Sequence, residues 1–243
     1  MTRRRKGVDV YRLDRASYYL LAEGGAFDGT KVELVNGLIV RRSDLLRPRK
    51  RAETRLMLPV LKDAPFEVHR IDRAAYQQLA DAGTFDGKRV ELIEGVIVSI
   101  NAMRGPHAST VMRLTRLLTA QLDDRVWVRA GLPLSVSRHS EPEPDFALVS
   151  DEVMSAAEEH PSTANLVIEV ADSSREFDLG LKALLYAAAK IPEYWVVDLQ
   201  TQKLVVHLEP KKGKYQRVHR FGKGREVTST VTPKVTLKVA AVF

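Results

Sequence analysis

A short stretch in the second half of the chain, Leu166-Val167-Ile168-Glu169-Val170, is apolar except for one carboxylate. Such a run between polar segments is typical of a buried strand, so we expect a sheet covered by other elements. Strand alternation places Glu169 on the same face as Val167 and Ala171. Because an isolated buried charge costs several kcal/mol, Glu169 predicts a cation, a lysine or arginine, or a dense set of hydrogen bonds beside it.

Two further ionisable residues extend this pattern. Asp145 follows a proline-rich run that holds the chain extended, and it opens the apolar stretch 146–149. Lys182 lies on the expected next helix, four residues from both Asp178 and Tyr186 and therefore on their face. Two carboxylates and a lysine can form a metal-dependent phosphodiesterase site. Simpler alternatives stay open, namely that Asp145 only caps a strand and that Asp178 and Lys182 form an exposed ion pair.

Composition limits the kinds of site that this chain can build. The sequence has no cysteine, so disulfides and thiolate metal sites are excluded, and oxygen or imidazole ligands favour magnesium, manganese or calcium. No apolar stretch follows the basic residues 3–6, and nowhere do eighteen apolar residues run together. We therefore expect a cytoplasmic protein that does not associate with a membrane. Its 243 residues and 44% hydrophobic content suit one large domain, or a medium domain with an extension.

Charge is distributed unevenly along the chain. Residues 1–65 hold 15 Lys or Arg against 8 Asp or Glu (+7), residues 66–202 hold 13 against 21 (−8), and residues 203–243 hold 10 against 2 (+8). Basic flanks around an acidic middle suit a protein that holds a cation at its centre and a polyanion across its ends. Basic termini are also common in proteins that bind nothing acidic, so the pattern alone leaves both interpretations open.

An internal repeat occupies the first part of the chain. Residues 10–40 and 68–98 align without gaps, and 18 of the 31 positions are identical. Each copy predicts a helix, a Phe-Asp-Gly turn and a hairpin that turns at Asn36-Gly37 or Glu94-Gly95. Two copies are too few for a solenoid, so the first copy is expected to be an added amino-terminal extension. A basic linker is expected between the two copies.

The remaining pattern indicates an α/β (α+β) fold with a mixed sheet flanked by helices. The expected elements are a helix from Pro106, strands at 126–136 and 146–149, a short helix at 151–159, a strand at 166–170, a helix at 177–190, and strands at 194–199 and 204–208. The expected divisions are an amino-terminal repeat copy at 1–40, a basic linker at 41–65, a core at 66–210 and a β-rich carboxy-terminal segment at 211–243.

Six motifs in order carry a resemblance to a known family. They are Glu91-Leu92-Ile93-Glu94-Gly95, Gly105-Pro106-His107, Pro144-Asp145, Val167-Ile168-Glu169-Val170, the pair Asp178 and Lys182, and Pro192-Glu193-Tyr194-Trp195-Val196-Val197-Asp198. Over about residues 66–210, the chain resembles the bacterial Uma-type restriction-endonuclease-like family of the PD-(D/E)XK nuclease superfamily.

The resemblance implies a set of roles for the residues in these motifs. Asp145 and Glu169 would hold Mg²⁺, with Mn²⁺ as a substitute, Lys182 would complete the site, and Glu91 and His107 would line it. The usual superfamily lysine lies two residues after the acid, where this chain has an alanine, so Lys182 would act from the helix instead. His107 at a helix start is equally consistent with a cap or a core histidine.

The leading hypothesis is a magnesium-dependent endonuclease that acts on DNA, without an organic cofactor. A homodimer is expected, since two cuts in a duplex call for two sites. The alternative is a non-catalytic module of the same fold that binds nucleic acid or another protein. The first repeat copy has Glu33 at the position of Glu91 but no counterpart of Asp145, Glu169 or Lys182, so it is not a second active site.

Overall fold

The computed structural model describes residues 8–27, 29–42, 68–102, 104–157, 159–232 and 234–243. It divides into two compact units, each described by itself below. The smaller unit comprises residues 8–101 and 137–141, and the larger unit comprises 102–136 and 142–243. Most of the expected basic linker, residues 43–65, lies outside the described residues. The domain boundaries drawn from the sequence stay predictions, and these units place both repeat copies together.

The larger unit is built on a mixed sheet, as the sequence predicts. This sheet has six strands, in the order β11-β10-β9-β8-β7-β6. The strands are β6 (Val126–Ala130), β7 (Phe146–Ser150), β8 (Leu166–Ala171), β9 (Glu193–Asp198), β10 (Lys203–Lys211) and β11 (Lys214–Phe221). Strands β8 and β9 pair in parallel, whereas the other neighbours are antiparallel. The connection between two parallel strands must cross over the sheet, and it does so through helices.

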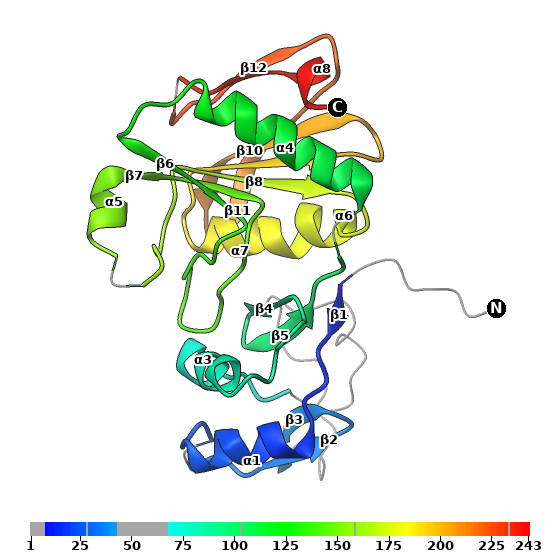
Figure 1. The fold of residues 1–243 in the computed structure, drawn as a ribbon, viewed down its shortest axis with the longest axis vertical. Coiled ribbons are helices and arrows are strands. Elements are labelled where there is room, and N and C mark those ends of the chain that lie inside the picture. Colours follow the sequence, from blue (N-terminus) through cyan, green and yellow to red (C-terminus); the bar gives the residue numbers. More distant parts are fainter. Residues whose placement is uncertain (1–7, 28, 43–67, 103, 158, 233) are drawn as a thin grey trace, which may run out of the picture. The chain divides into compact units, whose positions relative to one another are not determined.

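Helices cover both faces of this sheet (Figure 1). Helix α4 (Gly105–Thr119) and the short α8 (Val239–Val242) pack on one face, where Ile168 and Trp195 are buried. The crossover runs through α6 (Arg175–Phe177), a π-helical turn η2 (Asp178–Lys182) and α7 (Ala183–Ala188). It covers the other face, where Val167 and Tyr194 are buried. The predicted alternation along β8 is therefore confirmed.

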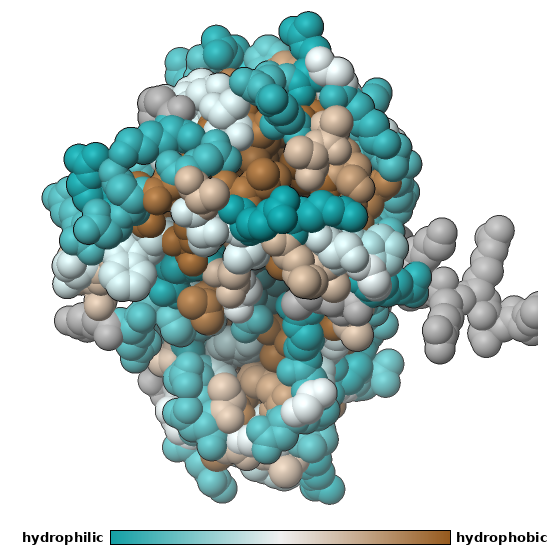
Figure 2. All heavy atoms as spheres, turned by 45° about the horizontal axis from the view of Figure 1, so that its top comes forward, coloured by the Kyte–Doolittle hydropathy of each residue, from teal (hydrophilic) through white to brown (hydrophobic). Residues whose placement is uncertain are grey.

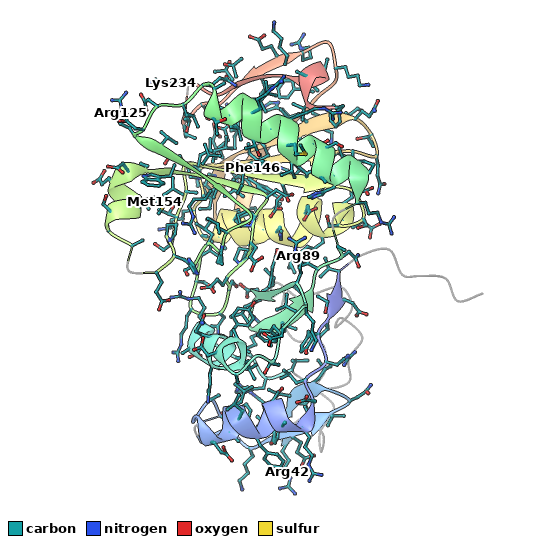
Figure 3. The ribbon with its side chains drawn as sticks, in the orientation of Figure 1. Arg42, Arg89, Arg125, Phe146, Met154 and Lys234 are labelled. Atoms are coloured by element: carbon teal, nitrogen blue, oxygen red, sulfur yellow. The ribbon has the colours of Figure 1, made fainter. Side chains whose placement is uncertain are left out.

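Smaller elements complete the larger unit. Helix α5 (Asp151–Ser155) follows β7, and strands β12 (Glu226–Thr228) and β13 (Thr236–Lys238) form a separate ribbon. Phe146 at the start of β7 is fully buried and lies in the interior of the unit (Figure 3). On the face drawn in Figure 2, hydrophilic side chains cover most of the surface and hydrophobic residues show between them.

The structure corrects several predicted elements. The strand expected at 126–136 ends at Ala130, because Gly131 takes a φ of +60° and its N–H turns to the carbonyls of Pro144 and Asp145. The helix expected to reach residue 159 ends at Ser155. The helix expected at 177–190 begins at Arg175 and contains the π-helical turn. Part of the expected β-rich tail, β11, belongs to the main sheet instead.

The smaller unit shows the repeat directly in its backbone. One copy forms α1 (Arg15–Glu23), β2 (Val32–Val35) and β3 (Leu38–Arg41), and the other forms α3 (Arg73–Asp81), β4 (Val90–Ile93) and β5 (Val96–Ser99). A short strand β1 (Asp9–Val10) pairs with β5. Equivalent tyrosines make the same contact in each copy: Tyr18 Oη donates to the carbonyl of Val32, and Tyr76 Oη to that of Val90, both at 3.1 Å.

The local signals of the repeat explain why each copy folds in this way. The side chains of Asp14 and Asp72 cap α1 and α3 by accepting from the backbone N–H groups of the third residue on. Both residues of each hairpin turn have positive φ, 50° and 76° at Asn36-Gly37 and 51° and 77° at Glu94-Gly95. Positive φ at both positions matches the twist of a two-residue hairpin. No helix in the described ranges is long and apolar enough to cross a membrane.

Candidate active site

Glu169 lies near the end of β8 and is 4% exposed. Its Oε1 accepts from Lys182 Nζ at 2.8 Å and from Tyr186 Oη at 3.0 Å. Burial raises the pKa of the Glu169 carboxyl, while the charge of Lys182 opposes that rise. The prediction that a lysine or a set of hydrogen bonds compensates this carboxylate is therefore confirmed, with Lys182 as the counter-charge and Tyr186 as a second donor.

The π-helical turn η2 positions Lys182 and Asp178. Both side chains are buried, with residue exposures of 4% and 3%, so the alternative of an exposed ion pair is wrong. The Lys182 ammonium also lies 5.8 Å from the ring centre of Phe177, which adds a cation–π contact. A π-helical turn inserts an extra residue and is frequent at functional sites, because it changes which side chains face the interior. Here it occurs where the lysine meets β8.

Asp178 is buried, which the sequence pattern did not predict. Its carboxylate accepts from Ser174 Oγ one turn earlier. Burial raises the pKa of the Asp178 carboxyl well above its usual value, and the negative charge of Glu169 raises it further. Its spacing of four residues from Lys182 was the available signal, but the same spacing fits a surface pair. Only the packing of η2 against the sheet distinguishes the two cases.

Asp145 stands immediately before β7, beside Glu169 on the neighbouring strand. Its Oδ2 accepts from the N–H of Val170 at 2.7 Å, and its own N–H points to Glu169 Oε2 at 3.3 Å. His107, in the first turn of α4, places Nε2 3.2 Å from the same Oδ2. The structure thus brings together Asp145, Glu169, Lys182 and His107, four of the five predicted site residues.

The fifth predicted residue, Glu91, lies on β4 in the smaller unit and is 2% exposed. Its role in the site stays a prediction. The equivalent residue of the first repeat copy, Glu33, is partly exposed and forms an ion pair with Arg42 at 3.0 Å. Glu94 belongs to the hairpin turn, where it pairs with Arg70 at 2.8 Å. The two copies therefore place the same type of residue in different surroundings.

A row of aromatic rings supports the site from the α7 side of the sheet. Tyr186 contacts Tyr194 with ring centres 4.9 Å apart, and Tyr194 contacts His207 at 5.2 Å. His207 in turn contacts Tyr215 of β11 at 5.6 Å. Burial lowers the pKa of His207 to about 4, so its imidazole is neutral near pH 7. Sequence patterns do not predict this row, because its members lie on four different elements.

The donor atoms of the two carboxylates fit a hard divalent cation. Asp145 Oδ1 takes part in none of the contacts above, and Glu169 Oε2 makes only the long contact to the N–H of Asp145. Mg²⁺ is usually held by one or two carboxylates and keeps several waters. A larger protein cage is absent from the described part of the chain, which contains no group of three or more His, Asp or Glu side chains that could hold a metal ion.

Comparison with known proteins identifies a family and a similar solved structure. Residues 73–240 match the Uma2 family, described as "Putative restriction endonuclease". The chain is also similar to a solved structure from Anabaena variabilis, described as a putative nuclease belonging to DUF820, at 14% sequence identity and a TM-score of 0.60. That match covers 71% of this chain and 97% of the other, and at this identity it shows a shared fold. No curated protein matches the chain.

Proposed function

Because this chain belongs to the Uma2 family, we propose that it is a nuclease that hydrolyses phosphodiester bonds of DNA with the help of a divalent metal ion. The observation that carries this proposal is the closeness of Asp145, immediately before β7, to Glu169 on the neighbouring β8, with Lys182 bonded to the second carboxylate. Phosphodiester hydrolysis needs an activated water and stabilisation of the charge that builds on the phosphate. The three side chains supply groups for both needs.

Asp145 and Glu169 are the residues that would hold Mg²⁺, or Mn²⁺ in its place. When bound, such an ion lowers the pKa of a nearby water and neutralises charge on the phosphate. The chain holds both carboxylates in fixed orientations, since Oδ2 of Asp145 is engaged by Val170 and His107 while Oε1 of Glu169 is engaged by Lys182. Asp145 Oδ1, and Glu169 Oε2 with only its long contact to the N–H of Asp145, are therefore the oxygens that would face the cation.

The electrostatics of the site support cation binding. Burial raises the pKa values of Glu169 and Asp178, and the negative charge of Asp145 raises both further. The charge of Glu169 also raises the pKa of Asp178. A divalent cation would add positive charge to that of Lys182 and would favour the ionised forms of these acids. The ammonium of Lys182 would then add positive charge where the attacked phosphate becomes more negative.

The alternative is a non-catalytic module of the same fold that binds nucleic acid or protein. The observation in its favour is that Lys182 and Tyr186 already satisfy Glu169 without any metal ion.

For the nuclease, we also propose a homodimer, because cutting both strands of a duplex calls for two sites related by symmetry.

Calorimetric titration with Mg²⁺ and Mn²⁺, followed by plasmid nicking with the same samples, separates the two functions. We expect wild type to bind the ion and nick the plasmid, and Glu169→Gln and Asp145→Asn to lose both properties. Glu152→Gln is the matched control, because this exposed acid lies on α5 in the same unit. Nicking by the two site variants at the wild-type rate would rule out the nuclease proposal, and metal binding without nicking would favour the non-catalytic module.

A further inference from the structure

The sheet of the larger unit ends in a strand that is strongly basic. Residues 211–225 hold seven Lys or Arg and no Asp or Glu. We call this segment the basic edge; its charged residues are Lys211, Lys212, Lys214, Arg217, Arg220, Lys223 and Arg225. Strand β11 forms its centre and is the last strand in the sheet order, pairing only with β10 among the described strands.

All seven of these basic residues are exposed. Only Arg217 forms an ion pair with another described residue, with Glu209 at 3.2 Å, and both of those side chains are more than half exposed. The other six make no ion pair with any residue in the described ranges. The positive charge is therefore not neutralised locally by the described part of the chain, and it faces solvent.

The charges occupy both faces of the edge. Arg217 lies opposite Leu208, which is buried with α4, whereas Arg220 lies opposite Val205, which is buried on the α7 side. On many edge strands, the sole role of charged residues is to prevent the edge-to-edge association of sheets. A single charge pointing outward is enough for that purpose, whereas here charge of one sign surrounds the strand and continues into the turns at both of its ends.

The dimensions of the edge suit an extended polyanion. Strand β11 has 8 residues, so it is about 26 Å long at about 3.3 Å per residue. A DNA strand presents one phosphate for each 3.4 Å or so of helix axis, so the edge matches the length of about seven or eight phosphates. Lys and Arg that neutralise phosphates are the main source of affinity for a nucleic-acid backbone.

The edge is also tied to the carboxylate site within one unit. Tyr215 of β11 contacts Tyr194 with ring centres 6.3 Å apart, and Tyr194 contacts Tyr186, whose hydroxyl donates to Glu169. Three strand spacings separate β11 from β8, which amounts to about 14 Å. This is close to the width of the major groove, about 12 Å, so one duplex can contact both places.

We propose that the basic edge is the surface on which this chain holds the phosphate backbone of duplex DNA, apart from the carboxylates that carry the chemistry. This inference rests on the proposed function, because it takes DNA as the substrate. It adds a docking surface on the opposite end of the sheet from β6, and it makes affinity and cleavage separable properties of the same unit.

The test is the salt dependence of binding to a fluorescently labelled 20-base-pair duplex in EDTA, measured by anisotropy. The variant Lys214→Gln/Arg217→Gln/Arg220→Gln/Lys223→Gln removes four positive charges from the edge. Each lost phosphate contact reduces the slope of log K against log salt by about 0.9, so we expect the slope to fall by about 3 to 4 and the affinity at low salt to fall at least tenfold.

The matched control removes four exposed positive charges elsewhere in the unit, in Arg113→Gln/Arg116→Gln/Lys190→Gln/Lys238→Gln. We expect its slope to stay close to that of wild type, and circular dichroism checks that both variants are folded. Equal losses in the two variants, or none in the edge variant, would overturn the proposal. So would binding to vesicles of anionic phospholipid through the edge with no binding to the duplex.

These outcomes are independent of the nuclease test. If wild type nicks plasmid but the edge variant binds DNA normally, the docking surface is wrong and the nuclease proposal stands. If wild type binds DNA through the edge and nicks nothing under any divalent metal, the docking surface stands and the nuclease proposal falls.

Discussion

Replacing Lys182 by methionine removes the ammonium group from the site and keeps most of the aliphatic volume. In the protein, Lys182 is 4% exposed and its Nζ lies 2.8 Å from Glu169 Oε1. Removing one partner of a buried ion pair costs about 3–5 kcal/mol, because the other charge is left uncompensated. Tyr186 still donates to Glu169, so we expect a loss near the lower end, about 3 kcal/mol, at pH 8.

The loss depends on pH in a defined direction. Burial raises the pKa of Glu169, and Lys182 opposes that rise, so the variant should have a still higher pKa at this carboxyl. A carboxyl whose pKa is higher in the folded protein than in the unfolded chain favours folding when it is protonated. The destabilisation is therefore complete above the folded pKa and decreases as the pH falls through it. The difference between variant and wild type should shrink from pH 8 to pH 5.

Urea unfolding followed by tryptophan fluorescence measures this difference, because both tryptophans, Trp127 and Trp195, belong to the larger unit. The double variant Lys182→Met/Glu169→Gln removes both charges and should lie within about 1 kcal/mol of wild type. Lys190→Met is the control at an exposed lysine. Wild-type stability of the single variant at both pH values, or a double variant that is less stable than the single one, would refute the reasoning.

Three further predictions concern other residues of the larger unit. Glu193 accepts from Trp195 Nε1 and Ser229 Oγ, both at 2.7 Å, so Glu193→Ala should lower the unfolding free energy by about 3–5 kcal/mol in urea by leaving both donors unpaired; an unchanged midpoint would contradict this. His107→Gln should weaken binding of Mn²⁺ about tenfold by calorimetry without changing thermal stability, because it alters a partner of Asp145, which we propose to hold the metal ion. Equal affinity would remove His107 from the proposed site. The pKa of His207 is lowered to about 4, so the free energy of unfolding should fall by about 3 kcal/mol as the pH falls from about 6.5 to 4. The variant His207→Phe should lose less over the same range. An NMR titration of His207 near pH 6.5 would argue against its burial.

The sequence predicted the acidic centre of this protein because its signals are local. Alternation along β8 identified the face of Glu169, and helical spacing identified Lys182 as a residue that can reach it. Asp145 was found from the prolines before it. These inferences need only a few neighbouring residues and the periodicity of a strand or a helix.

The features that the sequence did not reveal depend on long-range pairing and on depth. Helical spacing could not distinguish an exposed Asp178 from a buried one. Strand periodicity could not show that β11 is the edge strand of the main sheet. The strand expected at 126–136 failed because Gly131 takes a left-handed conformation that no periodicity signals. His207 joins the aromatic row only through contacts with other strands and with β11.

The carboxylate of Glu193 at the start of β9 also bears on the order in which the chain acquires its structure during synthesis. Its Oε1 accepts from Trp195 nearby, whereas its Oε2 accepts from Ser229 and Thr230, 36 and 37 residues further along. Contacts at such separation form only after the intervening loop has closed, which slows folding. We therefore expect that, when β9 has just emerged from the ribosome, both carboxylates of the candidate site are present but Glu193 Oε2 still lacks its donors Ser229 and Thr230. Satisfaction of this buried oxygen would then wait until residues 229 and 230 have emerged.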